Sequence, residues 1–100
     1  MRSASWPFDQ SPNCAVLTVR PIAFSGAPIL RVSHDIGDHG WQFLDSGDPD
    51  QSQAALLALS EIVQLDPTVL EVADLPVGWL AWRDSKVAPW QRRKRSDNGV

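Results

Sequence analysis

The chain has 100 residues, of which 43% are hydrophobic and 21% charged, and its formal net charge is −3. This length fits one domain, since domains commonly contain about 50–250 residues, and the balance of apolar and charged residues is that of a folded chain. A two-domain architecture and a wholly disordered chain are therefore excluded. The single cysteine, Cys14, excludes an intramolecular disulfide, and its apolar neighbours indicate an inert thiol inside a strand.

The charged residues are unevenly distributed along the sequence. The stretch from Asp35 to Asp74 contains nine carboxylates and neither Lys nor Arg, whereas residues 92–95 form a basic run. An acidic surface accelerates encounters with basic partners and repels nucleic acid. We therefore expect a protein partner, and neither a nucleic acid nor a membrane.

Neither a signal peptide nor a membrane-spanning helix is visible in the sequence. A signal peptide needs an apolar run of about 7–15 residues and a spanning helix needs about 18, and the sequence contains no such run. A lone cysteine is typical of proteins from reducing compartments. We expect a cytoplasmic protein.

Residues 1–13 are predicted to form an irregular lead-in to the domain. They contain two prolines and show no periodic spacing of apolar residues, although Trp6 or Phe8 is expected to pack against the domain. The folded domain is expected to cover residues 14–91. Residues 92–100 are expected to form a flexible basic tail.

Three strands are predicted in the first half of the domain. Residues 14–20 are rich in β-branched side chains and are closed by Pro21, which cannot donate to a neighbouring strand. Residues 29–34 alternate between two faces. Residues 41–44 follow a glycine-flanked turn over 37–40, so that a β-meander is expected.

The main helix is predicted over residues 48–65. Asp48 has the position of an N-cap, Pro49 occupies the first helical position, and Gln51 stands where a capping-box partner would lie. The apolar residues that follow recur at helical spacing. A shorter helical segment is predicted over residues 66–72, where an Asp-Pro pair repeats the same start signal.

Two more strands are predicted in the last third of the chain. Residues 77–82 are apolar on both alternating faces, as in a central strand covered on two sides. Residues 87–90 are expected to form an edge strand, because Pro89 cannot donate to a neighbour. The predicted fold class is α+β, a small antiparallel sheet of about four or five strands with one main helix packed on one face. Its core is predicted to contain Trp41, Phe43, Leu56, Leu59, Val63, Trp79 and Leu80.

No catalytic or metal site is predicted. His34, Asp35, Asp38 and His39 form the only cluster of metal-ligand types, and a zinc site needs three or four ligands that converge on a rigid frame. Ser33-His34-Asp35 contains the residue types of a hydrolytic triad, but neighbours along a strand point to opposite faces. We therefore expect no enzyme activity, no cofactor and no resident metal.

Three segments of the chain resemble a family of small bacterial proteins. Residues 39–48 contain a Gly-Trp-x-Phe run followed by Gly-Asp, residues 65–70 contain an Asp-Pro pair, and residues 75–79 contain Pro-x-Gly. Together they are similar to the Imm33-like immunity proteins, some of which neutralise a toxin encoded nearby. The resemblance implies a cytoplasmic single-domain protein that binds a toxin.

We expect a non-catalytic protein-binding module, in the form of an immunity protein that masks a basic toxin with an acidic surface. Trp41 is the candidate hot spot of this surface, with core packing as its alternative role. The predicted partner-binding residues are Asp35, Asp38, Trp41, Asp45, Asp48 and Asp50.

Two alternatives stay open. The first is a small metal-dependent enzyme or sensor that uses His34 and His39 with the adjacent carboxylates. The second is a structural homodimer without a toxin partner, formed through the exposed edge predicted at residues 87–90.

Overall fold

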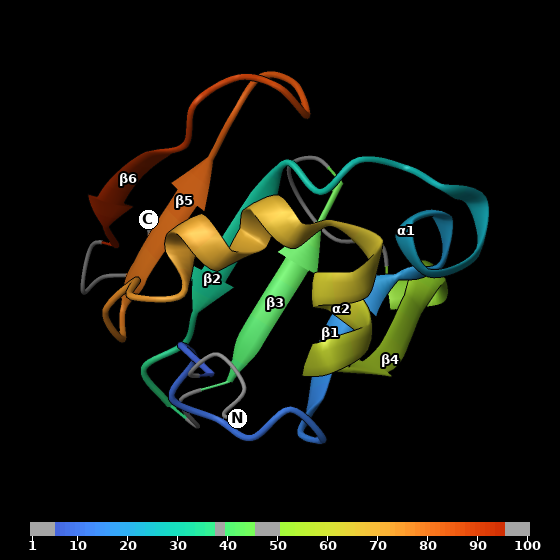
Figure 1. Ribbon diagram of the computed structural model, residues 1–100, viewed down its shortest axis with the longest axis horizontal. Helices are drawn as coiled ribbons and strands as arrows, with labels where there is room; N and C mark the ends of the chain where they lie inside the picture. Colours follow the sequence, from blue (N-terminus) through green and yellow to red (C-terminus); the bar gives the residue numbers. More distant parts are fainter. Residues whose placement is uncertain (1–5, 38–39, 46–50, 96–100) are drawn as a thin grey trace, which may run out of the picture.

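Six strands form one sheet in the computed structural model, which describes residues 6–37, 40–45 and 51–95. The strands are β1 (Ala15–Val19), β2 (Arg31–His34), β3 (Trp41–Leu44), β4 (Ala54–Ala58), β5 (Trp79–Trp82) and β6 (Gln91–Lys94). Their order across the sheet is β4-β1-β3-β2-β5-β6 (Figure 1). β1 and β3 run parallel, and the other neighbouring pairs are antiparallel. The α+β class is confirmed, but the sheet is mixed and has more strands than predicted.

The described part of the chain contains several short helical segments in place of one main helix. They are α1 (Arg20–Ser25), the 3₁₀ segment η1 (Gln51–Gln53), α2 (Leu59–Leu65) and the 3₁₀ segment η2 (Pro67–Val72). β1 ends before Pro21, as predicted, but the proline then lies in the first turn of α1, where a missing N–H leaves no helical bond unmade. Gly26 ends α1 with φ 75°, a left-handed conformation that suits glycine.

The predicted helix over residues 48–65 is wrong for residues 54–58; residues 51–53 form η1, and the start signal at Asp48 and Pro49 lies outside the described residues. Residues 54–58 form β4, which pairs antiparallel with β1 along its whole length. The helix α2 begins only at Leu59, and Glu61 Oε1 caps it by accepting the Ala58 N–H at 2.8 Å. The run Ala-Ala-Leu-Leu-Ala is too short for periodicity to separate helix from strand, so that pairing with β1 decides its conformation.

The shorter predicted helical segment is confirmed as η2. Asp66 caps it, because Asp66 Oδ1 accepts the Thr68 N–H at 3.0 Å and the Thr68 hydroxyl at 2.6 Å. Pro67 follows in the first helical turn, where it needs no N–H. The Asp-Pro pair therefore correctly predicted the start of a helical segment at this position.

The end of the chain differs from the prediction. β5 is confirmed within residues 77–82, but residues 87–90 form no strand. β6 lies at residues 91–94 and pairs with β5 along its length, and three of its four residues belong to the segment 92–100 that was predicted to be a flexible tail. Pro89 lacks an N–H for pairing, whereas every residue of β6 has one. The dimer edge predicted at 87–90 is therefore wrong, and β4 and β6 are the outer strands of the described sheet.

The lead-in contributes to the core instead of lying outside the domain. Phe8 is buried and meets Trp41 edge-on, with 5.0 Å between ring centroids. Trp6 packs beside Phe8 at a centroid distance of 5.6 Å. The expectation that this segment packs against the domain is confirmed.

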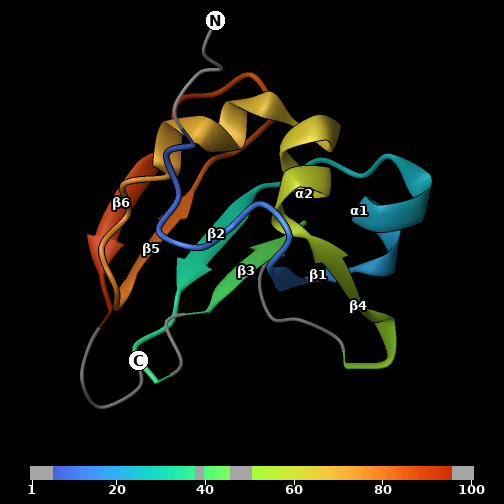
Figure 2. The same cartoon turned by 60° about the horizontal axis from the view of Figure 1, so that its bottom comes forward.

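The sheet is covered unequally on its two faces. The lead-in, α2 and η2 lie on one face, and α1 packs against β1 and β4 (Figures 1 and 2). No described helix covers the other face over β2, β5 and β6 (Figure 2). Within the described ranges, no helix is both long and apolar enough to cross a membrane.

The core lies between the sheet and the helical layer. Four of the predicted core residues are buried, and Val63 and Trp79 pack against the core with part of their surface exposed. Leu56 is 68% exposed, so its assignment to the core is wrong. In β4 it points away from the helices, whereas a helix would have turned it inward. The four buried predicted residues are Trp41, Phe43, Leu59 and Leu80, of which Leu80 lies on the opposite face of the sheet and outside the core cluster.

Candidate binding site on the open sheet face

The predicted acidic surface is not assembled in the described residues. Asp35 follows β2 and Asp45 follows β3, and because these strands are antiparallel the two carboxylates lie at opposite ends of the strand pair. Asp35 is also engaged, since its Oδ2 accepts Gln42 Nε2 at 2.9 Å and its Oδ1 lies 3.5 Å from Arg95 Nη1. The other predicted acidic contacts, Asp38, Asp48 and Asp50, lie outside the described residues.

Trp41 is a core residue and presents no surface to a partner. It is 2% exposed, and its ring stacks on His34 at a centroid distance of 4.0 Å. Its indole Nε1 donates to Asp9 Oδ1 at 2.9 Å. The alternative role of Trp41 in core packing is therefore confirmed, and its role as a binding hot spot stays a prediction that its burial does not favour.

His34 anchors the lead-in and the loop after η2. Its Nδ1 lies 2.7 Å from the Leu75 carbonyl oxygen, which can only accept, so Nδ1 carries the proton. Its Nε2 lies 3.1 Å from Asp9 Oδ2 but has no hydrogen-bond partner in the described part of the chain. His39, its predicted partner in a metal site, lies outside the described residues, and within those residues no three potential metal-ligating side chains of His, Cys, Asp or Glu cluster.

Cys14 lies before β1 and is only partly buried, so that the prediction of a thiol inside an apolar strand is wrong. Its Sγ donates to Gln10 Oε1 at 3.0 Å. The contact joins the lead-in to the start of the sheet, and nothing about it indicates a nucleophile, since no described base lies at hydrogen-bond distance from the sulfur.

A buried ion pair joins β5 to η2. Arg83 Nη2 lies 2.7 Å from Asp66 Oδ2, and both side chains are almost fully buried. The same guanidinium donates to the Ile29 carbonyl at 3.0 and 2.9 Å and to Thr68 Oγ1 at 2.9 Å. It also lies over the Trp90 ring, 4.1 Å from the centroid. Because the charge and the donors of Arg83 are satisfied internally, this pair is structural.

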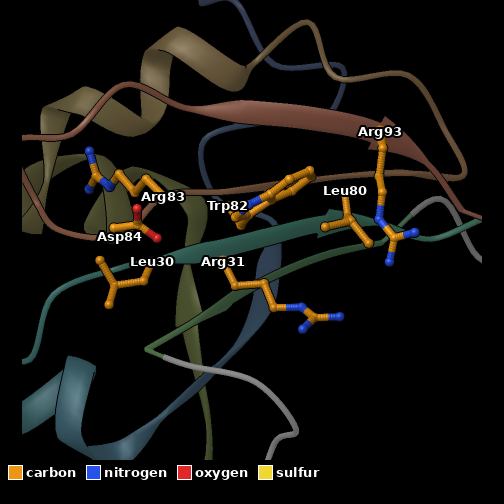
Figure 3. A pocket seen from close by; sticks show the side chains of 7 residues that line it. All are labelled: Leu30, Arg31, Leu80, Trp82, Arg83, Asp84 and Arg93. Atoms are coloured by element: carbon orange, nitrogen blue, oxygen red, sulfur yellow. The ribbon is translucent and has the colours of Figure 1, made fainter.

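A pocket of about 600 Å³ lies on the uncovered side of β2 and β5 (Figure 3). Arg31 and Arg93 extend into the same space beside Trp82 and Leu80, whereas Arg83 turns away toward Asp66. The volume falls within the range of about 300–1,000 Å³ that ligand sites occupy. The pocket is lined by Leu30, Arg31, Leu80, Trp82, Arg83, Asp84 and Arg93.

The strand register explains why these side chains meet. Arg31 pairs with Trp82, and Leu80 pairs with Arg93. Residues directly opposite each other share a face, and residues two apart on a strand share it as well. All four side chains therefore point to the open face. β2 and β6 are separated by β5, so the backbones of Arg31 and Arg93 lie two strand spacings, about 10 Å, apart across the sheet.

The charge of the pocket is positive. The guanidinium groups of Arg31 and Arg93 form no hydrogen bond or ion pair with another described residue, whereas those of Arg83, Arg92 and Arg95 all have partners. Asp84 is the only carboxylate that lines the pocket. Arg83 is neutralised by Asp66, so two free guanidinium groups face one carboxylate. An anionic ligand or surface is therefore favoured.

The open face continues from the pocket into an apolar region. Leu17 in β1 pairs with Leu56 in β4 and lies beside Gln42 in β3, so these three side chains share the face of Arg31 and Leu80. Leu56 is largely exposed, and Leu17 is partly exposed. The uncovered surface thus combines aliphatic side chains at one end with a basic aromatic pocket at the other.

The sequence analysis missed Arg31, Trp82 and Arg93 as candidate site residues. The predicted alternation over residues 29–34 already separates Arg31 from the apolar face of its strand, which is a usable signal. Trp82 was assigned to a strand covered on both sides, and Arg93 to a flexible tail. Nothing in either local sequence indicates that β6 pairs with β5.

Comparisons of the chain with protein-family models, with curated proteins and with solved structures find no match.

Proposed function

We propose that this protein is a non-catalytic protein-binding module that contacts its partner through the open face of the sheet. The observation that carries the proposal is the pocket between β2, β5 and β6, where Trp82 lies with two unpaired arginines on a face that no described helix covers. Sheets with one face packed and one face open often use the open face for recognition, and large exposed apolar side chains there mark interaction sites.

The buried His34 and Asp66, whose residue types could serve in acid-base catalysis, instead form contacts that stabilise the fold. His34 is buried, with Nδ1 bonded to the Leu75 carbonyl and Nε2 beside the Asp9 carboxylate, so a substrate does not reach its ring. Asp66 is engaged with Arg83 and Thr68. A general base or nucleophile needs a free proton-accepting atom that a substrate can reach. These contacts support a binding role over an enzymatic one.

The specific form of the proposal is an immunity protein that binds a toxin encoded nearby. Its support is the sequence resemblance of residues 39–48, 65–70 and 75–79 to the Imm33-like family. The contact surface now proposed differs from the predicted acidic one. The pocket region of the open face carries more free positive charge than negative, so the patch on the toxin that it covers is proposed to be acidic.

Co-expression of this protein with the large product of a neighbouring gene tests the proposal. A complex on pull-down, together with rescue of growth if that product is toxic, is the expected result. Substitutions on the two layers then locate the contact surface: Leu56→Glu and Arg93→Glu change the open face, and Leu70→Glu and Arg92→Glu change the opposite layer. A complex disrupted only by the second pair would contradict the proposed surface, and the absence of any complex would contradict the proposed immunity partner.

A further inference from the structure

We infer that the pocket between β2, β5 and β6 binds a carboxylate-bearing peptide segment of the partner, with an apolar side chain of that segment lying on Trp82. The inference rests on the proposed protein-binding function and names the chemistry of the partner. The inference is based on a single pocket of about 600 Å³ that contains three kinds of group. They are two guanidinium groups without a partner, a surface of aromatic and aliphatic side chains, and one exposed carboxylate.

The anion-binding part consists of Arg31 and Arg93. The two side chains rise from strands on either side of β5 and extend into the same space (Figure 3). A guanidinium offers a planar fork of N–H donors that matches the two oxygens of a carboxylate, and such charge-assisted bonds are stronger than neutral ones. Because neither arginine has a described partner, binding an anion breaks no existing ion pair.

The apolar part consists of Trp82, Leu80 and Leu30. Trp82 is partly exposed on the open face, whereas Leu80 beneath it is buried. A partly exposed indole gives a large rigid contact area at low entropic cost, as at protein interfaces. A ligand with an aromatic or branched aliphatic side chain next to its carboxylate would pack against these three side chains.

Asp84 distinguishes a peptide from a simple polyanion. Its exposed carboxylate lines the same pocket and would repel a second negative group, but it can accept a backbone N–H from a peptide. Two free arginines and one aspartate leave a single net positive charge once Arg83 is paired with Asp66. This balance suits one carboxylate better than a multiply charged phosphate ester.

The surroundings of the pocket favour a protein over a nucleic acid. Leu17 and Leu56 extend the open face as an aliphatic surface, which can pack against apolar side chains of a protein. Aliphatic side chains offer neither positive charge nor hydrogen-bond donors to a phosphate backbone. On the other side of β6, Glu71 and Asp74 lie beside Arg92, which donates to the Glu71 carbonyl and pairs with Asp74. These acidic groups would weaken a contact with a strand of nucleic acid that ran past this edge.

The inference is tested on the full-length protein with two matched dipeptides, acetyl-Phe-Asp-amide and acetyl-Phe-Asn-amide, which differ only in the carboxylate. Titration followed by NMR shifts of the Trp82 indole and the arginine Nε–H groups should show the Asp peptide binding about ten-fold more tightly, as expected of charge-assisted bonds. Phenyl phosphate and a single-stranded oligonucleotide are titrated in parallel. Equal binding of the two peptides, or tighter binding of phenyl phosphate or of the oligonucleotide at physiological salt, would overturn the inference.

Neighbouring arginines supply the matched variants. Arg31→Gln and Arg93→Gln should each weaken binding of the Asp peptide about ten-fold. Arg92→Gln removes the same charge from the next residue, but its side chain faces the other layer, so binding should not change. Thermal melts confirm that the variants fold. An Arg92→Gln effect as large as that of Arg93→Gln would show a non-specific charge effect and overturn the assignment.

The partner complex separates this inference from the function on which it rests. If the partner binds with unchanged affinity to Arg31→Gln and Arg93→Gln, the pocket chemistry is wrong and the binding function stands. If the Asp peptide binds in the pocket but no neighbouring gene product forms a complex, the pocket chemistry stands and the proposed immunity partner is wrong.

Discussion

At the scale of single residues, two polar contacts hold segments that are distant in the sequence. Asp66 and Arg83 form a buried pair between η2 and the end of β5, and Asp9 joins the lead-in to Trp41 and His34. Removing the partner of a buried polar group destabilises the folded state, because the group has lost its contacts with water and no hydrogen bond or ion pair replaces them. These contacts are therefore sensitive points of the fold.

Replacing Asp66 with Ala should lower the free energy of unfolding by about 3–5 kcal/mol, because Arg83 stays buried without its counter-charge and η2 loses its cap. Urea denaturation measures the change. Asp74→Ala is the control: this aspartate pairs with Arg92 at the surface with 78% of its side chain exposed, so its loss should cost less than about 1 kcal/mol. Equal costs for the two variants would contradict the structural role of the buried pair.

Asp9→Ala should lower the free energy of unfolding by about 1–3 kcal/mol, because the buried Trp41 Nε1 loses its acceptor. Asp9→Asn keeps an oxygen that can accept from Trp41, so it should cost less than the alanine variant does. Tryptophan fluorescence during denaturation follows both. An asparagine variant as unstable as the alanine one would instead place the stabilisation in the negative charge of Asp9 and not in its bond to Trp41.

At the scale of secondary-structure elements, β4 and β6 decide which residues are core and which are surface. β4 turns Leu56 outward and α2, which follows directly, turns Leu59 inward. β6 covers the edge of β5 and brings Arg93 beside Leu80. Both elements were misassigned from the sequence, and both misassignments changed the proposed surface.

The two leucines of this region give a direct test of β4. Leu56→Lys should leave the free energy of unfolding within about 0.5 kcal/mol of the parent, since the side chain is already exposed. Leu59→Ala should cost about 2–5 kcal/mol, because it opens a cavity in the core. If residues 48–65 were one helix with Leu56 on its buried face, Leu56→Lys would be the more damaging change.

Truncation of the chain tests β6. A chain that ends at Trp90 loses the strand that pairs with β5, so its melting temperature should fall by roughly 5–10 °C. A chain that ends at Arg95 keeps all four residues of β6 and should melt like the parent. Differential scanning calorimetry on both separates a paired strand from a flexible tail, because removal of a flexible tail would change neither melting temperature.

At the scale of the whole molecule, the two layers of the domain differ in their chemistry. The helical layer and lead-in enclose the core and carry Glu61, Glu71 and Asp74, whereas the open face carries Arg31 and Arg93. A net charge of −3 therefore does not describe the proposed contact surface. Local potential, more than net charge, steers the approach of a partner.

Reversal of the two arginines should slow the proposed partner complex. In the double variant Arg31→Glu, Arg93→Glu the association rate constant should fall about ten-fold at low salt, and the difference should shrink as salt is added. Surface plasmon resonance at several ionic strengths measures this. Arg92→Glu with Lys86→Glu changes the charge equally away from the open face, and an equal loss of rate there would show that only net charge matters.

Local sequence is sufficient to specify the α+β class, four of the strands near their true bounds and the helical turn that starts at Asp66. These features are local: alternation at residues 29–34 and 41–44, a β-branched run before Pro21 and an Asp-Pro cap each specify backbone conformation through neighbouring residues. Burial of Trp41 and Phe43 follows from the same alternation, because a strand with one covered face buries every second side chain.

Only the tertiary structure decided the conformation of residues 54–58 and 91–94, and with them the candidate site. An alanine and leucine run becomes a strand because β1 offers its hydrogen-bonding edge, and a basic run becomes a strand because β5 does the same. The β1–β4 pairing joins residues far apart in the chain, whereas the β5–β6 pairing only closes the loop at residues 83–90. In both cases the partner strand, more than the residues of the run itself, specifies the strand conformation. The pocket of Arg31, Trp82 and Arg93 combines three strands, so its chemistry exists only after the sheet has formed.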